Sequence, residues 1–194
     1  MRKQLVWVLF VFVLSGCMSS PSRKYYQLHL GGDQEPGLRT INKTVLIEQI
    51  EVDDLYDDFR VVYRISPYEL NYYSYEFWAD KPADLIRDSI TQYLSQKKIF
   101  KKVIQEISKG DPDILWGSKI YFIEEIDKPE AWYARLSMEI ELVDFKSKKQ
   151  IYHHKFDRKE ELDKKSAAEV PVMLSKILEE ELRKVINDLY RIIE

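Results

Sequence analysis

The stretch Trp132-Tyr133-Ala134-Arg135-Leu136-Ser137-Met138-Glu139-Ile140-Glu141-Leu142 alternates between apolar and mostly polar side chains over eleven residues. Successive side chains of a β-strand point to opposite faces of the sheet. A period of two therefore predicts a strand with one buried face and one solvated face. The buried set of this strand would be Trp132, Ala134, Leu136, Met138, Ile140 and Leu142.

The segments on either side of this stretch extend the predicted sheet. Ile114–Ile126 should form a hairpin with Trp132–Phe145, and a charged turn at Lys146–Lys149 should lead into a strand over Gln150–Phe156. Because neighbouring strands are joined by short turns, we expect mostly antiparallel pairing. Further strands are expected toward the N-terminus, at Tyr25–Leu30, Thr44–Val52, Phe59–Ile65, Glu69–Tyr75 and Ile99–Ile107, with a turn at Ser66-Pro67.

Two amphipathic helices complete the predicted fold. The first has Asp80 as its N-cap and Pro82 in its first turn, and should run to about Lys97. The second should begin near Val172, after Ser166 and Glu169, which resemble a capping box, and Glu179–Glu181 should form part of its solvated surface. The apolar stripe of this second helix consists of Leu174, Ile177, Leu178, Leu182, Val185, Ile186 and Leu189. The sequence therefore predicts a single-domain α+β fold, a mostly antiparallel sheet with both helices packed on one face.

The composition excludes several classes of protein. A chain of 194 residues with 45% hydrophobic content and a net charge of −3 fits one folded domain and not a disordered chain. The 30 basic and 33 acidic residues leave no excess positive charge, which argues against a nucleic-acid partner. A single cysteine excludes a disulfide framework or a cysteine-rich zinc site within one chain.

The N-terminus has the pattern of a lipoprotein signal peptide. Arg2 and Lys3 precede the apolar run Leu5–Leu14, which would span about half of the ~30 Å hydrocarbon core of a bilayer. The run ends in Leu14-Ser15-Gly16-Cys17, which resembles the bacterial lipobox, in which the cysteine is acylated. We therefore expect a signal peptide over 1–16, a lipidated tether over 17–23 and an α+β domain over 24–194. A core cysteine after a short hydrophobic helix is the alternative, and it leaves the charge and the small residues unexplained.

The residue after the cysteine bears on localisation. Position 18 is Met and not Asp, and by resemblance to the sorting rule for lipoproteins of Gram-negative bacteria this favours the periplasmic face of the outer membrane. The acyl chains on Cys17 would be the only non-protein groups, because no cofactor is expected.

The sequence offers little material for catalysis. It contains no Gly-x-Ser-x-Gly elbow, phosphate-binding glycine loop or dinucleotide-binding glycine motif. His153 and His154 are neighbours in a predicted strand, so they should point to opposite faces and cannot share a metal ion. We therefore expect no enzyme activity and no metal site.

One local feature stands above this background, a cluster of aromatic residues made up of Tyr68, Tyr72, Tyr73, Tyr75, Phe77 and Trp78. Alternation along the strand places large rings on both of its faces. One interpretation is core packing with cross-strand aromatic pairs. The other is a surface where tyrosines contact a partner chain or lipid.

The segment from Val62 to Ala79 is similar to the signature of the ABC-type transport auxiliary lipoproteins, a family that itself resembles paraquat-inducible protein C. The matching residues are Val62-Tyr63-Arg64, Tyr73 and Trp78-Ala79, and the lipobox and the opening Tyr25-Tyr26-x-Leu28 match as well. Asp80-Lys81-Pro82 departs from the family's usual Pro-Glu-Leu after Trp-Ala.

This resemblance implies a non-catalytic adaptor, anchored at the outer membrane. Such lipoproteins work with mammalian-cell-entry (MCE) domain proteins and an associated permease and ATPase to move lipids between the two membranes. Tyr63, Arg64, Tyr72, Tyr73 and Trp78 would contribute to the fold or to docking, and a ring-forming partner would favour a matching homo-oligomer. Arg64, on a mostly apolar strand, should find a carboxylate or carbonyl partner. The alternatives are a carrier that itself binds lipid and an envelope-assembly lipoprotein that acts without an ABC transporter.

Overall fold

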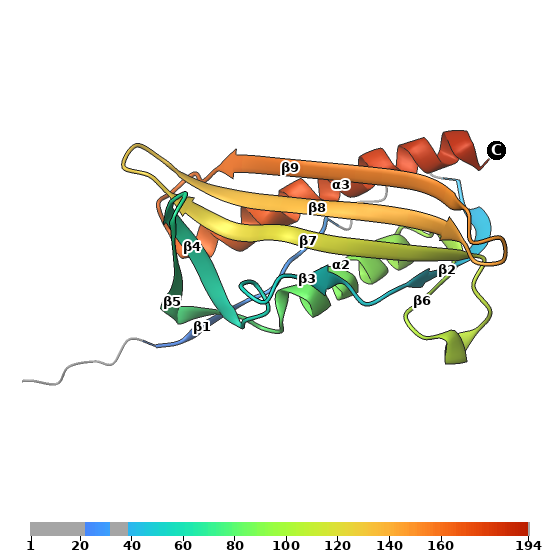
Figure 1. Cartoon of the computed structure of the whole chain (residues 1–194), viewed down its shortest axis with the longest axis horizontal. Coiled ribbons are helices and arrows are strands. Elements are labelled where there is room, and N and C mark those ends of the chain that lie inside the picture. Colours follow the sequence, from blue (N-terminus) through green and yellow to red (C-terminus); the bar gives the residue numbers. More distant parts are fainter. Residues whose placement is uncertain (1–21, 32–38, 194) are drawn as a thin grey trace, which may run out of the picture.

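The computed structural model describes residues 22–31 and 39–193. The predicted signal peptide, Cys17 and most of the predicted tether lie outside the described residues. Nine strands and two α-helices lie within them (Figure 1). Their bounds are β1 Lys24–Tyr26, β2 Ile41–Ile47, β3 Glu51–Val52, β4 Arg60–Ser66, β5 Glu69–Trp78, α2 Pro82–Gln96, β6 Phe100–Ile104, β7 Ile114–Asp127, β8 Trp132–Asp144, β9 Gln150–Glu161 and α3 Val170–Ile192.

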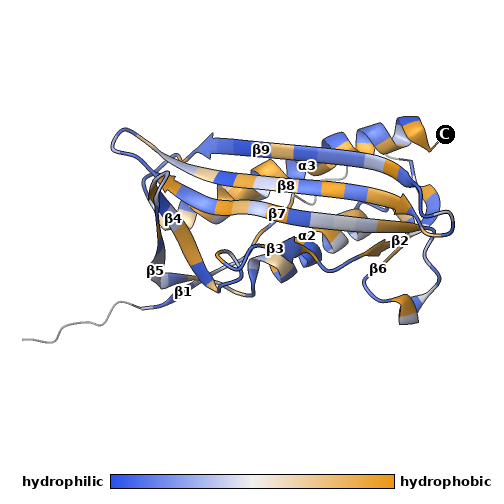
Figure 2. Cartoon of the chain, viewed as in Figure 1, coloured by the Kyte–Doolittle hydropathy of each residue, from blue (hydrophilic) through white to orange (hydrophobic). Residues whose placement is uncertain are grey.

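The long antiparallel ladder β7–β8–β9 is the part of the sheet that alternation predicted. Ile120 pairs with Met138 and Leu136 pairs with Arg158, and the apolar side chains of β8 from Ala134 to Leu142 are fully buried. β9 continues five residues beyond the predicted end at Phe156. This extension consists mostly of charged residues on an edge strand, so it has no hydrophobic pattern from which a strand could be predicted. Its pairing with β8 is what makes it part of the strand. Figure 2 shows the hydrophilic character of much of β9.

The prediction of mostly antiparallel pairing was wrong, because the sheet is mixed. The parallel pairs lie along the edge of β7 that faces away from β8. Three short strands pair with this edge in parallel, first β2, then β3 and then β4, at Val45 with Ile114, Val52 with Ile120 and Arg64 with Ile126. β2 also pairs in parallel with β6, and β1 with β5. The chain passes this edge before it forms α2 and β6, and it then returns as β7 in the same direction. Such long connections are what parallel pairing requires.

Two predicted strands near the N-terminus differ in extent. The expected strand Thr44–Val52 is divided into β2 and β3, although the backbone N–H of Glu48 still donates to the carbonyl of Trp116 at 3.0 Å. The strand expected over Tyr25–Leu30 ends at Tyr26. Leu30 is nevertheless buried, because the segment after β1 lies against α3, where the backbone N–H of His29 donates to the Ser175 hydroxyl at 3.0 Å.

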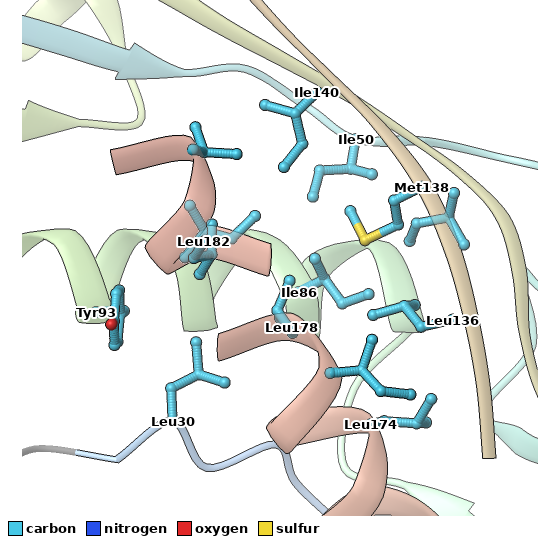
Figure 3. Packing of buried hydrophobic residues seen from close by; sticks show 14 of the residues in the cluster. Leu30, Ile50, Ile86, Tyr93, Leu136, Met138, Ile140, Leu174, Leu178 and Leu182 are labelled. Carbon is cyan, nitrogen blue, oxygen red and sulfur yellow. The ribbon is translucent and has the colours of Figure 1, made fainter. Parts of the chain in front are cut away.

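Both helices lie on the same face of the sheet, as predicted (Figure 1). Figure 3 shows Leu174, Leu178 and Leu182 of α3 among Leu136, Met138 and Ile140 of β8 and Ile86 of α2. Burial of such side chains is the main favourable term in folding, at roughly 1.5–3 kcal/mol for each large apolar residue.

The helix boundaries correct three local expectations. The N-cap of α2 is Lys81 and not Asp80, because a proline at the first helical position favours extended backbone in the residue before it. α3 begins at Val170, since Pro171 is tolerated in the first turn, where its missing N–H would have no helical partner. Ser166 caps the short 3₁₀ turn Ala167–Glu169 instead of α3.

The expectation that Glu179–Glu181 is a solvated surface was also wrong for Glu181. This carboxylate is buried between α3 and β9, where His154 Nε2 lies 2.7 Å away and Lys184 Nζ donates at 2.7 Å.

The face of the sheet opposite the helices also buries some side chains at one end. The loop between β3 and β4 folds over this face and buries Tyr56, whose ring packs edge-on against Phe122 with centroids 6.2 Å apart. Val62 is buried beside them. The polar residues described next lie beside these buried side chains.

Candidate functional site

Arg64 is the centre of a polar cluster on the outer face of the sheet, away from the helices. Its Nε donates to Glu124 Oε2 at 2.9 Å, and its Nη2 donates to the Tyr56 hydroxyl at 3.1 Å. The Tyr56 hydroxyl donates to the same carboxylate oxygen at 2.6 Å. The prediction that Arg64 finds a carboxylate partner is confirmed.

A second arginine completes this cluster. Arg135 Nη1 donates to Glu124 Oε1 at 3.2 Å, and its other nitrogens hold Asp157 in a bidentate pair at 2.8 and 2.7 Å. The Arg135 guanidinium also lies over the Phe122 ring, 3.6 Å from its centroid. We call Tyr56, Arg64, Glu124, Arg135 and Asp157 the Glu124 network.

The Glu124 network holds a carboxylate that water does not reach. The side chain of Glu124 is 0% exposed, so two arginines and one hydroxyl must replace its hydration. Burial raises the pKa of Tyr56, and its hydrogen bond to Glu124 raises it further, so this hydroxyl stays a neutral donor. Arg135 lowers the pKa of Asp157 through their paired hydrogen bonds. The network therefore fixes two arginines in place at the surface.

The next residue along β7, Glu125, lies on the opposite face with Tyr63 and Tyr73. The Tyr73 hydroxyl donates to Glu125 Oε1 at 2.8 Å, and the two tyrosine rings are 4.7 Å apart. Glu125 is fully buried, and its Oε2 has no hydrogen-bond partner among the described residues. Burial raises the pKa of Glu125 to about 7, and the nearby Asp127 adds to the effect. This carboxyl group is therefore protonated in part of the population at neutral pH.

Tyr72 and Trp78, the other two predicted residues, hold the same strand in place by different means. The Tyr72 hydroxyl donates to the carbonyl of Leu55 at 3.0 Å, and the Arg60 guanidinium lies 4.3 Å from its ring centroid. Trp78 is 2% exposed within the main core. The five predicted residues thus do not form one surface: Arg64 and Tyr72 face outward, Tyr63 and Tyr73 contact Glu125, and Trp78 is inaccessible.

A groove of about 430 Å³ lies beside the Glu124 network. Arg64, Ile126 and Tyr133 form one row across three neighbouring strands of its floor, as the register of β4, β7 and β8 requires. We call it the cationic groove, and the residues that line it are Arg64, Ile65, Ser66, Pro67, Ile126, Lys128, Tyr133, Arg135 and Lys159.

Sequence reasoning missed most of these contacts. Tyr56, Glu124, Glu125 and Arg135 were not among the predicted site residues. One signal was available in the sequence, because Glu124-Glu125 interrupts an otherwise apolar part of the strand Ile114–Ile126. Two acids in such a strand predict buried carboxylates that need partners.

The two neighbouring histidines lie on opposite faces, as predicted. His153 Nε2 is 2.8 Å from Glu139 on the outer face, whereas His154 Nε2 contacts Glu181 of α3. Hydrogen bonds from Tyr121 and His153 lower the pKa of Glu139 to about 2. Within residues 22–31 and 39–193, no group of three histidine, cysteine or acidic side chains is arranged to hold a metal ion.

Neither α2 nor α3 is both long and apolar enough to cross a membrane.

Comparison with known proteins gives one family and several similar structures. The model of the family described as ABC-type transport auxiliary lipoprotein component matches residues 26–185. Protein XCC0632 from Xanthomonas campestris has a similar fold, with a TM-score of 0.75 at 15% identity, covering 88% of this chain and 95% of that one. An uncharacterized protein gives a TM-score of 0.69 at 16% identity, covering 87% and 99% of the two chains. The hypothetical protein CT253 from Chlamydia trachomatis gives 0.51 at 10% identity, covering 75% and 96%. No curated protein matches the sequence.

Proposed function

Because the chain belongs to the family of ABC-type transport auxiliary lipoprotein components, we propose that it is a lipid-anchored, non-catalytic adaptor of an MCE-type lipid-transport system. The match over residues 26–185 is the observation that carries this proposal, because it spans nearly all of the folded domain. An auxiliary component of an ABC transporter acts beside a permease and an ATPase, and we assign the MCE-domain protein as its direct contact.

The anchor in this proposal is Cys17 at the periplasmic face of the outer membrane. Acyl chains on this residue would hold the domain by a tether of seven residues, 17–23. A fully extended tether of that length reaches about 24 Å. Single acyl chains bind membranes reversibly, whereas two or three together give stable anchoring. Met18 supports the choice of the outer membrane.

The docking surface in this proposal is the exposed part of the aromatic cluster around β5. Tyr68, in the β4–β5 turn, is 98% exposed, and Tyr75 is also exposed. Tyrosine is enriched in protein interfaces because it combines a large apolar ring with a polar tip. Trp78 in the main core and Tyr72 on the outer face both hold β5 in place, so the exposed rings would be presented on a rigid element.

Co-purification tests the adaptor function directly. The lipoprotein, extracted in mild detergent from cells that express the neighbouring transport genes, should bring down an MCE-domain protein. Replacing both exposed rings, Tyr68→Ser with Tyr75→Ser, should reduce recovery of the partner at least fivefold. Ile107→Ser is the matched control, because Ile107 is also exposed but lies after β6, far from β5. Failure to crosslink any MCE-domain protein in intact cells would refute the proposal.

The alternative of a carrier that holds an acyl chain between sheet and helices receives less support. The side chains on the two sides of that layer, such as Leu136, Leu178 and Ile86, are fully buried and belong to one packed cluster (Figure 3).

A further inference from the structure

The groove beside the Glu124 network combines positive charge with an apolar floor, and two of its four cations, Lys128 and Lys159, take no part in that network. Lys128 and Lys159 are exposed side chains at the groove, and Arg64 and Arg135, which are more buried, also line it. Ile65, Pro67, Ile126 and Tyr133 provide apolar surface between these cations. Figure 1 shows that this end of the molecule gathers the β4–β5 turn and the turn between β7 and β8.

The charges of the groove do not cancel. Glu124 and Asp157 neutralise the two arginines through the contacts of the Glu124 network. Lys128 and Lys159 form no salt bridge with the described residues, although Lys159 also acts on Asp157 and helps to lower the pKa of that carboxyl group. Lys128 lies over the Tyr133 ring, 5.7 Å from its centroid. The four cations and the two carboxylates named here leave a net charge of about +2 above an apolar floor, which is complementary to a ligand with an anionic head and an apolar chain.

We propose that the cationic groove binds a phospholipid with an anionic headgroup, its phosphate between Lys128 and Lys159 and the start of an acyl chain along Ile65, Ile126 and Tyr133. The volume of about 430 Å³ falls in the range of roughly 300–1,000 Å³ found for small-molecule sites. The proposal deepens the adaptor function, on which it rests for the choice of a lipid, by giving the subunit a place to hold the cargo briefly.

An acidic peptide of a partner is the rival occupant, and the groove suits it less well. The floor consists of β4, β7 and β8, whose backbone groups already pair within the sheet, since β7 has β4 on one side and β8 on the other. An extended peptide would find no free strand edge to pair with there. An acyl chain needs only apolar contact, which Ile65 at 47% exposure and Tyr133 offer.

The test uses the full mature lipoprotein in phosphatidylcholine nanodiscs. A short-chain phosphatidylglycerol, monomeric in solution and carrying a diazirine on its acyl chain, is added and activated by light. Labelling should fall within residues 64–67 or 126–133. It should be about tenfold stronger than the labelling obtained with a diazirine-bearing phosphatidylcholine of the same chain length. Equal labelling by the two lipids, or labelling confined to other regions, would overturn the proposal.

Variants make the test specific to the groove. Lys128→Gln with Lys159→Gln should reduce labelling at least tenfold, because each lysine contributes roughly a factor of five toward an anionic lipid. Lys101→Gln with Lys146→Gln removes the same charge from exposed positions on β6 and in the β8–β9 turn and should leave labelling unchanged. Equal loss in both double variants would show only a general charge effect and would overturn the proposal.

The remaining arm separates lipid from peptide. A diazirine-bearing acidic peptide should label the groove weakly, and peptide labelling stronger than lipid labelling would reject the lipid in favour of a protein partner. No MCE-domain protein is present in any arm. If lipid labelling is absent but an MCE-domain protein still co-purifies, only the proposal of lipid binding in the groove is refuted. If labelling is present but no MCE-domain protein co-purifies, only the adaptor proposal is refuted.

Discussion

Glu124 and Glu125 are adjacent carboxylates on one strand, and they meet opposite environments. Glu124 faces outward and receives hydrogen bonds from two arginines and a tyrosine, so its charge is compensated. Glu125 faces the helices, where one hydroxyl is its partner and burial favours the neutral acid. Alternation along a strand, the same property that predicted the sheet, separates the two carboxylates.

Removing Arg64 should destabilise the domain, because it leaves the buried charge of Glu124 under-compensated. We expect Arg64→Ala to lower the free energy of unfolding by about 2–3 kcal/mol, less than the full cost of a broken buried pair since Arg135 and Tyr56 remain. Urea denaturation followed by tryptophan fluorescence measures this change. Arg191→Ala, which removes a surface pair with Asp188, should cost less than about 0.5 kcal/mol. Comparable losses in the two variants would contradict the role given to Arg64.

Glu125 should make stability depend on pH near neutrality. Its pKa is about 7 in the folded protein against an ordinary 4.5, so the folded state keeps a proton that the unfolded state has lost. Stability should therefore fall as the pH rises from about 4.5 to 7 and change little above that, by up to about 3 kcal/mol in total.

Glu125→Gln isolates this contribution, because glutamine keeps the shape and remains neutral. The variant should have a higher Tm than the parent at pH 8 and nearly the same Tm at pH 5. Thermal unfolding at the two pH values measures both differences. A Tm difference independent of pH would show that Glu125 does not titrate in this range.

At the scale of elements, the sequence was informative wherever a pattern was local. Alternation in Trp132–Leu142 predicted β8 and its neighbours, and the apolar stripe predicted α3 within two residues of its start. The parallel pairing of β2, β3 and β4 with β7 could not be predicted, because strand direction depends on long connections that leave no local pattern. Arg64 and its need for a carboxylate were predicted, but Glu124 and Arg135 were not, since these partners are 60 and 11 residues away along the chain from the residues they contact, Arg64 and Glu124.

The contact of α3 with β9 depends on a buried carboxylate that the helical pattern assigned to solvent. Glu181 accepts from Lys184 and Arg158 and lies 2.7 Å from His154 Nε2. Glu181→Ala should reduce the free energy of unfolding by about 2 kcal/mol, because these partners lose a shared acceptor in a buried site. Chemical denaturation measures the loss. Lys176→Ala, an exposed residue of the same helix, is the control, and an equally large loss there would show that any α3 substitution has this effect.

At the scale of the whole molecule, the two faces of the sheet differ in what they contribute. The face covered by α2 and α3 contains the main core and supplies stability. The opposite face, with the Glu124 network and the cationic groove at one end, stays largely open, and the two proposed functions use this face and the β4–β5 hairpin.

Attachment of the folded domain to the membrane should depend on the thiol of Cys17. Cys17→Ser should abolish metabolic labelling with palmitate and shift the protein from the membrane fraction to the soluble fraction. Ser19→Ala, two residues further along, should leave both unchanged. Fractionation with immunoblotting measures the shift, and a serine variant as membrane-bound as its parent would refute the anchor.

The charged extension of β9 has a consequence for a protein confined to a surface. Molecules held by acyl chains diffuse in two dimensions, where collisions between neighbours are frequent and an unpaired strand invites fibril-like stacking. Lys155, Asp157, Lys159 and Glu161 are exposed along this strand, and joining two such strands would strip water from their charges. The charged length of β9 that hydrophobicity could not reveal should therefore disfavour edge-to-edge pairing between neighbouring molecules.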